Sequence, residues 1–154
     1  DALSFFSKNK KKFDLILIKQ TIHLLKLNEI KTLLIKMKKS LKPKGKIFIF
    51  TLDPHKNEIP NFTLMRVKLL RSLKRDKKIL KFISKLHRKR IKKYFSYKVK
   101  ISKKKYIDMI SKRFISILLN FKREQIVTGI NEINLKYKRK IIFNDKLVCI
   151  IIKK

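Results

Sequence analysis

The clearest hydrophobic pattern lies in the first third of the chain. Residues 13–18 (FDLILI) are almost all apolar, which predicts a short strand buried on both faces. Apolar residues recur at helical spacing over 30–41, and Pro43 and Gly45 predict the end of this helix. A second apolar run predicts a strand near 46–51. A parallel strand–helix–strand unit of this kind binds ligands beyond the carboxyl ends of its strands.

The rest of the chain predicts helices followed by two short strands. Alternating residues over 97–101 predict a short strand or extended connector. Two apolar runs joined at Asn144-Asp145 predict a terminal antiparallel hairpin, with strands near 140–144 and 146–153. Helically spaced apolar residues predict four helices, over 62–73, 79–94, 102–118 and 126–137, the first two joined near Arg75-Asp76.

These elements predict one α/β domain, for which a length of 154 residues is well suited. We expect one sheet in which the first two strands are parallel and the last is antiparallel to its neighbours. The expected parts are a strand–helix–strand unit over 1–52, a helical insertion over 53–121, and a terminal helix and hairpin over 122–154.

Three segments of this pattern resemble a known family. They are Asp1-Ala2, the run FDLILIKQTIHLL from Phe13 and the run SLKPKGKIFIF from Ser40. Together they are similar to the second half of a class I S-adenosylmethionine-dependent methyltransferase domain. The family usually has Gly at the position of Lys44, whereas Gly45 matches its turn. The resemblance implies a partial Rossmann-like sheet and S-adenosylmethionine as the cofactor.

The resemblance also implies roles for five residues. Asp1 would accept a hydrogen bond from the adenine amino group, and small Ala2 would let the adenine ring lie flat. Lys19 and Gln20 would meet the methionine part of the cofactor. His23 would be a general base that takes a proton from the methyl acceptor, because an imidazole ordinarily titrates near neutrality. The alternatives are a disordered chain end for Asp1 and a capping or packing role for His23.

Five further residues are candidates for substrate contact. His55, Asn57 and Glu58 lie in the loop after the second strand, where they would face the expected cleft. Tyr106 and Arg113 lie on one predicted helix and could contact an anionic substrate. Solvated loop residues and a solvated arginine are the alternatives. The three histidines share no ligand spacing and only one cysteine is present, so no metal site is expected.

Glycine is scarce in this sequence, which contains only Gly45 and Gly129. The Gly-x-Gly cofactor loop of the family is therefore not among these residues. Because the chain also begins with Asp1 rather than Met, we expect it to be the carboxy-terminal part of a longer protein. As such a fragment it would lack much of the cofactor site and would be inactive on its own.

The net charge is +34, from 44 Lys and Arg against 10 Asp and Glu, and it raises the question of nucleic-acid binding. Abundant Lys, Ile, Asn and Phe with few Gly, Ala and Pro are also typical of AT-rich codon usage. The lysines are spread along the whole chain. We therefore expect nucleic-acid binding, where it occurs, to be nonspecific and steeply dependent on salt.

The leading functional hypothesis is methyl transfer to a small-molecule acceptor. Methylation of RNA or a ribosomal protein, and RNA binding without catalysis, are the alternatives. RNA binding without catalysis needs exposed aromatic residues among basic ones, whereas Phe62, Phe82, Phe114 and Tyr137 are in register with aliphatic residues, as core residues would be. No apolar run is long enough for a membrane span, no signal peptide is visible and Cys149 lies in an apolar run, so a cytoplasmic location is expected.

Overall fold

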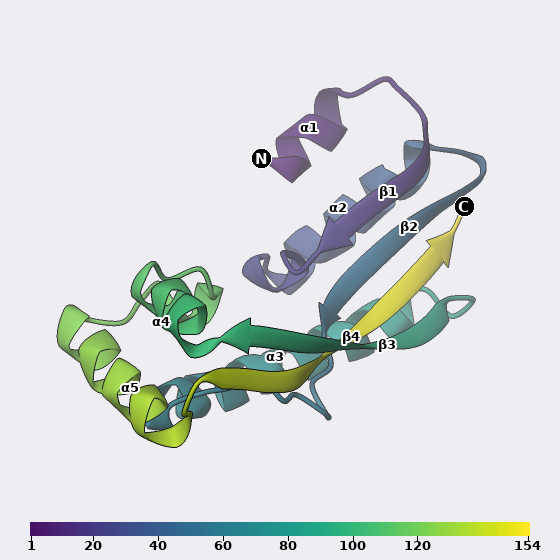
Figure 1. Cartoon of the computed structure of the whole chain (residues 1–154). Helices are drawn as coiled ribbons and strands as arrows, with labels where there is room; N and C mark the ends of the chain where they lie inside the picture. The colour runs from purple at the N-terminus through teal and green to yellow at the C-terminus, as the bar shows by residue number, and fades with distance from the viewer. The chain divides into compact units, whose positions relative to one another are not determined.

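The computed structural model describes all residues, 1–154, and has an α/β fold with one mixed four-stranded sheet (Figure 1). The strand order is β1-β2-β4-β3. The strands are β1 (Phe13–Lys19), β2 (Leu41–Leu52), β3 (Ile91–Ser102) and β4 (Lys140–Lys153). The helices are α1 (Ala2–Lys8), α2 (Leu27–Lys39), α3 (Thr63–Leu86), α4 (Lys103–Ser111) and α5 (Arg123–Lys136), with short 3₁₀ turns η1 (Ile22–Leu24) and η2 (Ser116–Leu118).

The parallel strand–helix–strand unit predicted from the apolar pattern is confirmed. β1 pairs with β2 in parallel, with Ile16 opposite Ile47 and Ile18 opposite Ile49, and α2 connects the two strands. β4 pairs with β2 in the antiparallel direction, as expected for the last strand. This β1–α2–β2 part of the sheet has the parallel connectivity of a Rossmann-like fold.

The chain forms two compact units, and each contains segments that are far apart in the sequence. The first unit contains residues 1–54, 75–95 and 147–154. The second unit contains residues 55–74 and 96–146. The strand–helix–strand unit therefore lies wholly within the first unit.

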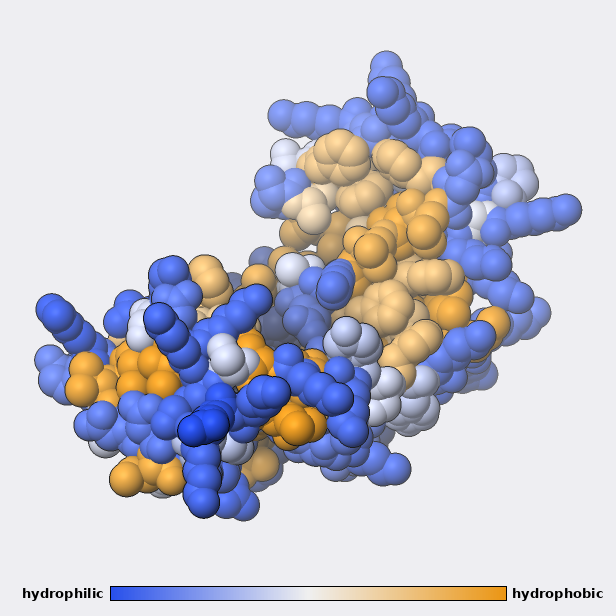
Figure 2. All heavy atoms as spheres, in the orientation of Figure 1, coloured by the Kyte–Doolittle hydropathy of each residue, from blue (hydrophilic) through white to orange (hydrophobic).

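The core of the first unit lies on one face of its sheet. Isoleucines of β1, β2 and β4 on this face are buried together with the apolar stripe of α2 and the last turns of α3. Outside this buried core, Figure 2 shows a surface on which apolar residues in orange lie over β1, β2 and β4, bordered by blue hydrophilic residues. The buried members of this core are Ile16, Ile18, Ile22, Ile30, Leu33, Leu34, Met37, Leu41, Ile47, Ile49, Ile79, Leu80, Ile83, Val148, Ile150 and Ile152.

β1 is not buried on both faces, so that prediction was wrong. The side chains of Leu15 and Leu17 are 52% and 56% exposed, whereas Ile16 and Ile18 are buried. β1 is an edge strand of the sheet, and successive side chains of a strand point to opposite faces. An apolar run shows that both faces of a strand are apolar, but it does not show that both are covered.

Helix α2 ends earlier than predicted, and the residues expected to stop it belong to β2. Ser40 ends the helix, its backbone N–H bonding to the carbonyls of its last turn, and β2 begins at the buried Leu41. Pro43 and Gly45 therefore lie inside the strand. A Cβ atom at Gly45 would lie 3.0 Å from the carbonyl oxygen of Phe13, so this glycine allows the close approach of β1 and β2.

Several predicted boundaries in the middle of the chain were also wrong. The helices expected over 62–73 and 79–94 are one helix, α3, because the residues between them include neither Gly nor Pro. Met65 of α3 belongs to the core of the second unit, whereas Ile79 belongs to that of the first. The residues after α3 form the long strand β3, and α4 ends at Ser111, which leaves Phe114 exposed rather than in a core.

The expected terminal hairpin is instead the single strand β4. Asn144 and Asp145 lie in its middle rather than in a turn. Ile141 belongs to the core of the second unit, whereas Val148 and the residues after it belong to that of the first. The polar pair therefore lies where β4 passes from one core to the other.

The second unit has its own core, in which α5 packs closely against an aromatic residue. Phe62 is buried, its ring lies 5.7 Å from that of Phe121, and a Cβ atom at Gly129 would lie only 2.6 Å from it. Across the whole molecule, none of the helices is long and apolar enough to cross a membrane. The buried members of this core are Phe62, Met65, Tyr106, Ile110, Leu118, Phe121, Ile126, Ile133 and Ile141.

Candidate cofactor and catalytic site

The carboxyl end of β1 has an unusual backbone conformation. Lys19 is the last residue of the strand, and Gln20 follows it with a φ of 53°. The backbone N–H of Gln20 donates to the carbonyl oxygen of Phe50 at 2.8 Å, which ties this turn to β2. A left-handed conformation is unfavourable for a residue other than glycine, and such strain is concentrated at functional sites. The turn lies where a parallel sheet binds ligands.

His23 lies directly after this turn, in η1. Ile22 is buried in the core, whereas His23 is half-buried. The carbonyl oxygen of Leu25 accepts a hydrogen bond from Nη2 of Arg75 at 3.3 Å, so the middle of α3 lies against the end of η1. Sequence analysis therefore placed His23 at the carboxyl end of β1 but did not predict that α3 would pack beside it.

Asp76, the residue after Arg75, is a buried carboxylate. It is only 4% exposed, and its Oδ1 atom has no hydrogen-bond partner. Burial raises the pKa of Asp76, while the charges of His23 and Arg75 act in the opposite direction. The lone Asp within RSLKRDKKIL was the only sequence signal for this residue, and it was interpreted as part of a joint between helices.

The carboxyl end of β2 also has buried polar residues. Thr51 is in the strand, opposite Val148 of β4, and Asp53 follows the strand; both side chains are buried. The first unit thus combines Lys19, Gln20 and His23 with acidic groups that sequence analysis did not select.

Asp1 and Ala2 lie at the start of α1. Oδ1 of Asp1 accepts hydrogen bonds from the backbone N–H groups of Leu3 and Ser4, at 2.6 and 3.1 Å. The carboxylate is therefore the N-cap of this helix. An adenine amino group that donated to this carboxylate would share it with the two backbone N–H groups of the helix cap. The role of Asp1 and Ala2 in binding adenine stays a prediction.

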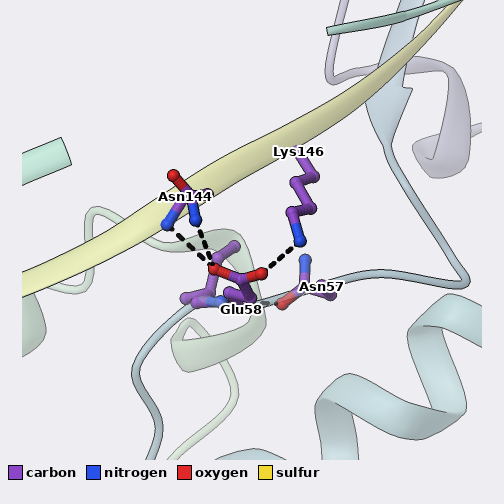
Figure 3. A network of polar contacts seen from close by, with 5 residues as sticks. Asn57, Glu58, Asn144 and Lys146 are labelled. Atoms are coloured by element: carbon purple, nitrogen blue, oxygen red, sulfur yellow. Dashed lines mark hydrogen bonds and ion pairs between the residues drawn. The ribbon is translucent and has the colours of Figure 1, made fainter. Parts of the chain in front are cut away.

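The five residues expected to contact substrate all belong to the second unit. Figure 3 shows Glu58 bound to two residues of β4: it pairs with Nζ of Lys146 and accepts hydrogen bonds from Asn144. These bonds, chiefly that from Lys146, lower the pKa of Glu58. Asn57 lies beside this network and accepts a hydrogen bond from the backbone of Ile59, at 3.0 Å.

The remaining three substrate candidates have different surroundings. His55 is exposed in the loop after β2. Tyr106 is buried, its hydroxyl donates to the carbonyl oxygen of Pro60, and burial raises its pKa. Arg113 donates from Nη2 to the carbonyl oxygen of Phe121 at 2.8 Å. Tyr106 and Arg113 thus bond to backbone carbonyls of their own unit, and no finding tests a contact with substrate.

Comparison with known proteins gave likenesses to solved structures alone. No family model matches the chain, and no curated protein matches it. A solved structure of the plantazolicin methyltransferase BpumL, in complex with a pentazolic desmethylPZN analog and SAH, is similar with a TM-score of 0.41 and 16% sequence identity. The match covers 99% of this chain and 56% of that protein. This chain therefore spans little more than half the length of that protein, and a likeness at this score does not establish an activity.

Proposed function

We propose that the first unit contributes part of an S-adenosylmethionine-dependent methyltransferase site that acts on a small-molecule acceptor. The observation that carries this proposal is the arrangement after β1, where the strained Gln20 is followed by His23 beside the buried Asp76. The sequence resemblance of the strand–helix–strand segment supports the same class of enzyme.

The residues of this chain fit only one side of the cofactor. Lys19 and Gln20, at the end of β1, would contact its amino-acid part, and Asp1 and Ala2 its adenine. Neither glycine belongs to a Gly-x-Gly cofactor loop, because Gly45 lies inside β2 and Gly129 inside α5. On this proposal, the contacts to the rest of the cofactor would be made by polypeptide outside residues 1–154. When bound, S-adenosylmethionine supplies a methyl group on a positively charged sulfur.

His23 would act on the methyl acceptor. Methyl transfer is an in-line displacement, so correct positioning provides much of the rate and a base removes the proton of the attacking group. The imidazole of His23 would accept that proton, and the nearby carboxylate of Asp76 would stabilise the resulting imidazolium. A half-buried position lets His23 contact both solvent-borne substrate and the protein interior.

Replacement of His23 tests the proposal. In the longer protein that contains this chain, His23→Ala should lower methyl transfer about a hundredfold while cofactor affinity is retained. The matched control is His87→Ala, since His87 is also a half-buried histidine of the first unit. Turnover, calorimetric cofactor affinity and melting temperature should be measured together. Full turnover in a folded His23→Ala protein would exclude the base role, and a loss of about 1 kcal/mol in stability with normal turnover would indicate packing alone.

A further inference from the structure

The density of positive charge between α3 and β3 is far above that of the chain as a whole. Five of the six residues over 88–93 (RKRIKK) are Arg or Lys, compared with 44 of 154 in the full sequence. Comparable clusters occur over 8–12 (KNKKK) and 136–140 (KYKRK), so what distinguishes residues 88–93 is the well-exposed aromatic residue beside them. Tyr94 follows these residues directly, and we call residues 88–94 the basic segment. The whole segment belongs to the first unit.

The basic segment is exposed and carries an aromatic ring among its cations. It enters β3, which is an edge strand, and every residue of β3 from Ile91 to Lys98 is exposed. The ring of Tyr94 is 61% exposed, and Nζ of Lys92 lies 4.9 Å from its centre. These two residues share one face of the strand, because they are two positions apart.

Neighbouring contacts hold this segment in a defined position. Phe95 packs against Phe50 of β2, with 5.6 Å between the ring centres. Nη1 of Arg90 donates to the carbonyl oxygen of Arg88 at 3.3 Å, which shapes the turn before the strand.

We propose that the basic segment is a binding surface for single-stranded RNA. Its cations would contact successive phosphates, and the exposed ring of Tyr94 would stack on a base. Cations that follow a backbone, combined with an aromatic ring, are the usual features of single-strand-binding surfaces. A duplex offers no free base face, and an acidic protein or a lipid headgroup would not need the ring. Unpaired bases are the usual targets of RNA recognition, which favours RNA as the partner. This surface does not depend on the methyltransferase proposal.

The aromatic residues that spoke against RNA binding in the sequence, Phe62, Phe82, Phe114 and Tyr137, are those in register with aliphatic ones. Tyr94 was assigned to a helix over 79–94, where it would have been a core position. The structure places it on an exposed strand instead, which meets the requirement stated for an RNA-binding surface.

The test is fluorescence anisotropy with the full chain and a labelled oligouridine RNA of about 12 nucleotides, a length typical of single-strand sites. Tyr94→Leu should weaken binding about tenfold without changing its dependence on salt, because no charge is removed. Lys92→Gln should reduce the slope of log affinity against log salt by about 0.7, the value for one phosphate contact in a single strand.

Two matched variants serve as controls, and melting temperatures confirm that each protein is folded. Phe114→Leu removes an exposed aromatic residue and Lys10→Gln an exposed lysine, both outside the basic segment, and neither should change affinity more than about twofold, the scatter expected of surface substitutions. The proposal is overturned by unchanged binding in Tyr94→Leu, or by an equal loss in Lys10→Gln and Lys92→Gln. It is also overturned if duplex RNA or anionic phospholipid vesicles bind as tightly as the single strand.

Discussion

Lys44 has a backbone conformation that is unfavourable for its side chain. Its φ is 65°, in the left-handed region, although it lies within β2. The methyltransferase family that the sequence resembles usually has glycine at this position. Glycine adopts positive φ without the steric cost that a Cβ atom brings. The side chain of Lys44 therefore brings a steric cost at this position that glycine would not.

Lys44→Gly should stabilise the protein by up to about 1 kcal/mol, because removal of the Cβ relieves the strain at positive φ. The control is Lys46→Gly, also in β2, where the backbone is ordinary strand and glycine should destabilise by about the same amount. Urea denaturation of both variants measures the difference. Equal destabilisation of the two would show that the conformation of Lys44 stores no strain.

Asp76→Asn should stabilise the protein at neutral pH and lower methyl transfer. Burial raises the folded-state pKa of Asp76 above its unfolded value, so the ionised group costs stability above the unfolded pKa. That cost begins to fall as the pH drops below the folded pKa and is gone below the unfolded pKa, so the two proteins should converge in acid. Denaturation from neutral to acidic pH measures the effect on stability, and the turnover assay used for His23→Ala measures the effect on methyl transfer.

Asp14→Asn is the control with the opposite sign. Its hydrogen bond and ion pair with Lys42 lower the pKa of Asp14, so its charge is stabilising above the unfolded pKa and this contribution is lost in acid. A loss of stability in Asp76→Asn at neutral pH would contradict the interpretation that burial of the ionised Asp76 carboxylate costs folding free energy.

At the scale of elements, α5 packs closely against Phe62 because the helix has a glycine, Gly129, at the point of contact. Gly129 lies within the helix, where glycine costs about 1 kcal/mol relative to alanine. A Cβ atom at this position would lie 2.6 Å from the buried ring of Phe62. The packing against Phe62 therefore requires glycine despite its low helix propensity.

Gly129→Ala should destabilise the protein by about 1–3 kcal/mol, since forcing apart a packed core outweighs the gain in helix propensity. Thr128→Ala, at the exposed neighbouring position, should be neutral or slightly stabilising because only helix propensity changes. Thermal unfolding of the pair distinguishes the two effects. A Gly129→Ala protein more stable than the parent would show that Phe62 moves aside without cost.

At the scale of the whole molecule, positive charge dominates. The net charge is +34, and the ion pairs Lys42–Asp14, Lys112–Asp108 and Lys146–Glu58 are all on side chains that keep contact with solvent. Exposed ion pairs contribute little, whereas a large net charge destabilises a compact state by self-repulsion.

Added salt should therefore stabilise the protein. The melting temperature should rise between about 0.01 and 0.15 M NaCl, because the Debye length falls from about 30 to 8 Å over this range. Sucrose solutions at constant ionic strength control for effects of the solute that are not electrostatic. A melting temperature that falls with salt would indicate that the ion pairs outweigh the repulsion.

Local elements with strong hydrophobic periodicity could be predicted from the amino-acid sequence alone. The parallel strands β1 and β2, the helix between them and α5 follow from runs and spacings within about twenty residues, and His23 follows from its place after β1. Hydrophobic periodicity specifies which side of an element is apolar, so it identifies such elements from neighbouring residues alone.

Which residues cover each element became clear only from the folded chain. The tertiary structure left Leu15 and Leu17 exposed, placed Asp76 beside His23 and put Tyr94 on an open edge. It also joined two predicted helices into α3 and two predicted strands into β4, since each of these elements contributes to both cores. The physical reason is that burial depends on contacts between residues far apart in the chain, and local periodicity contains no information about them.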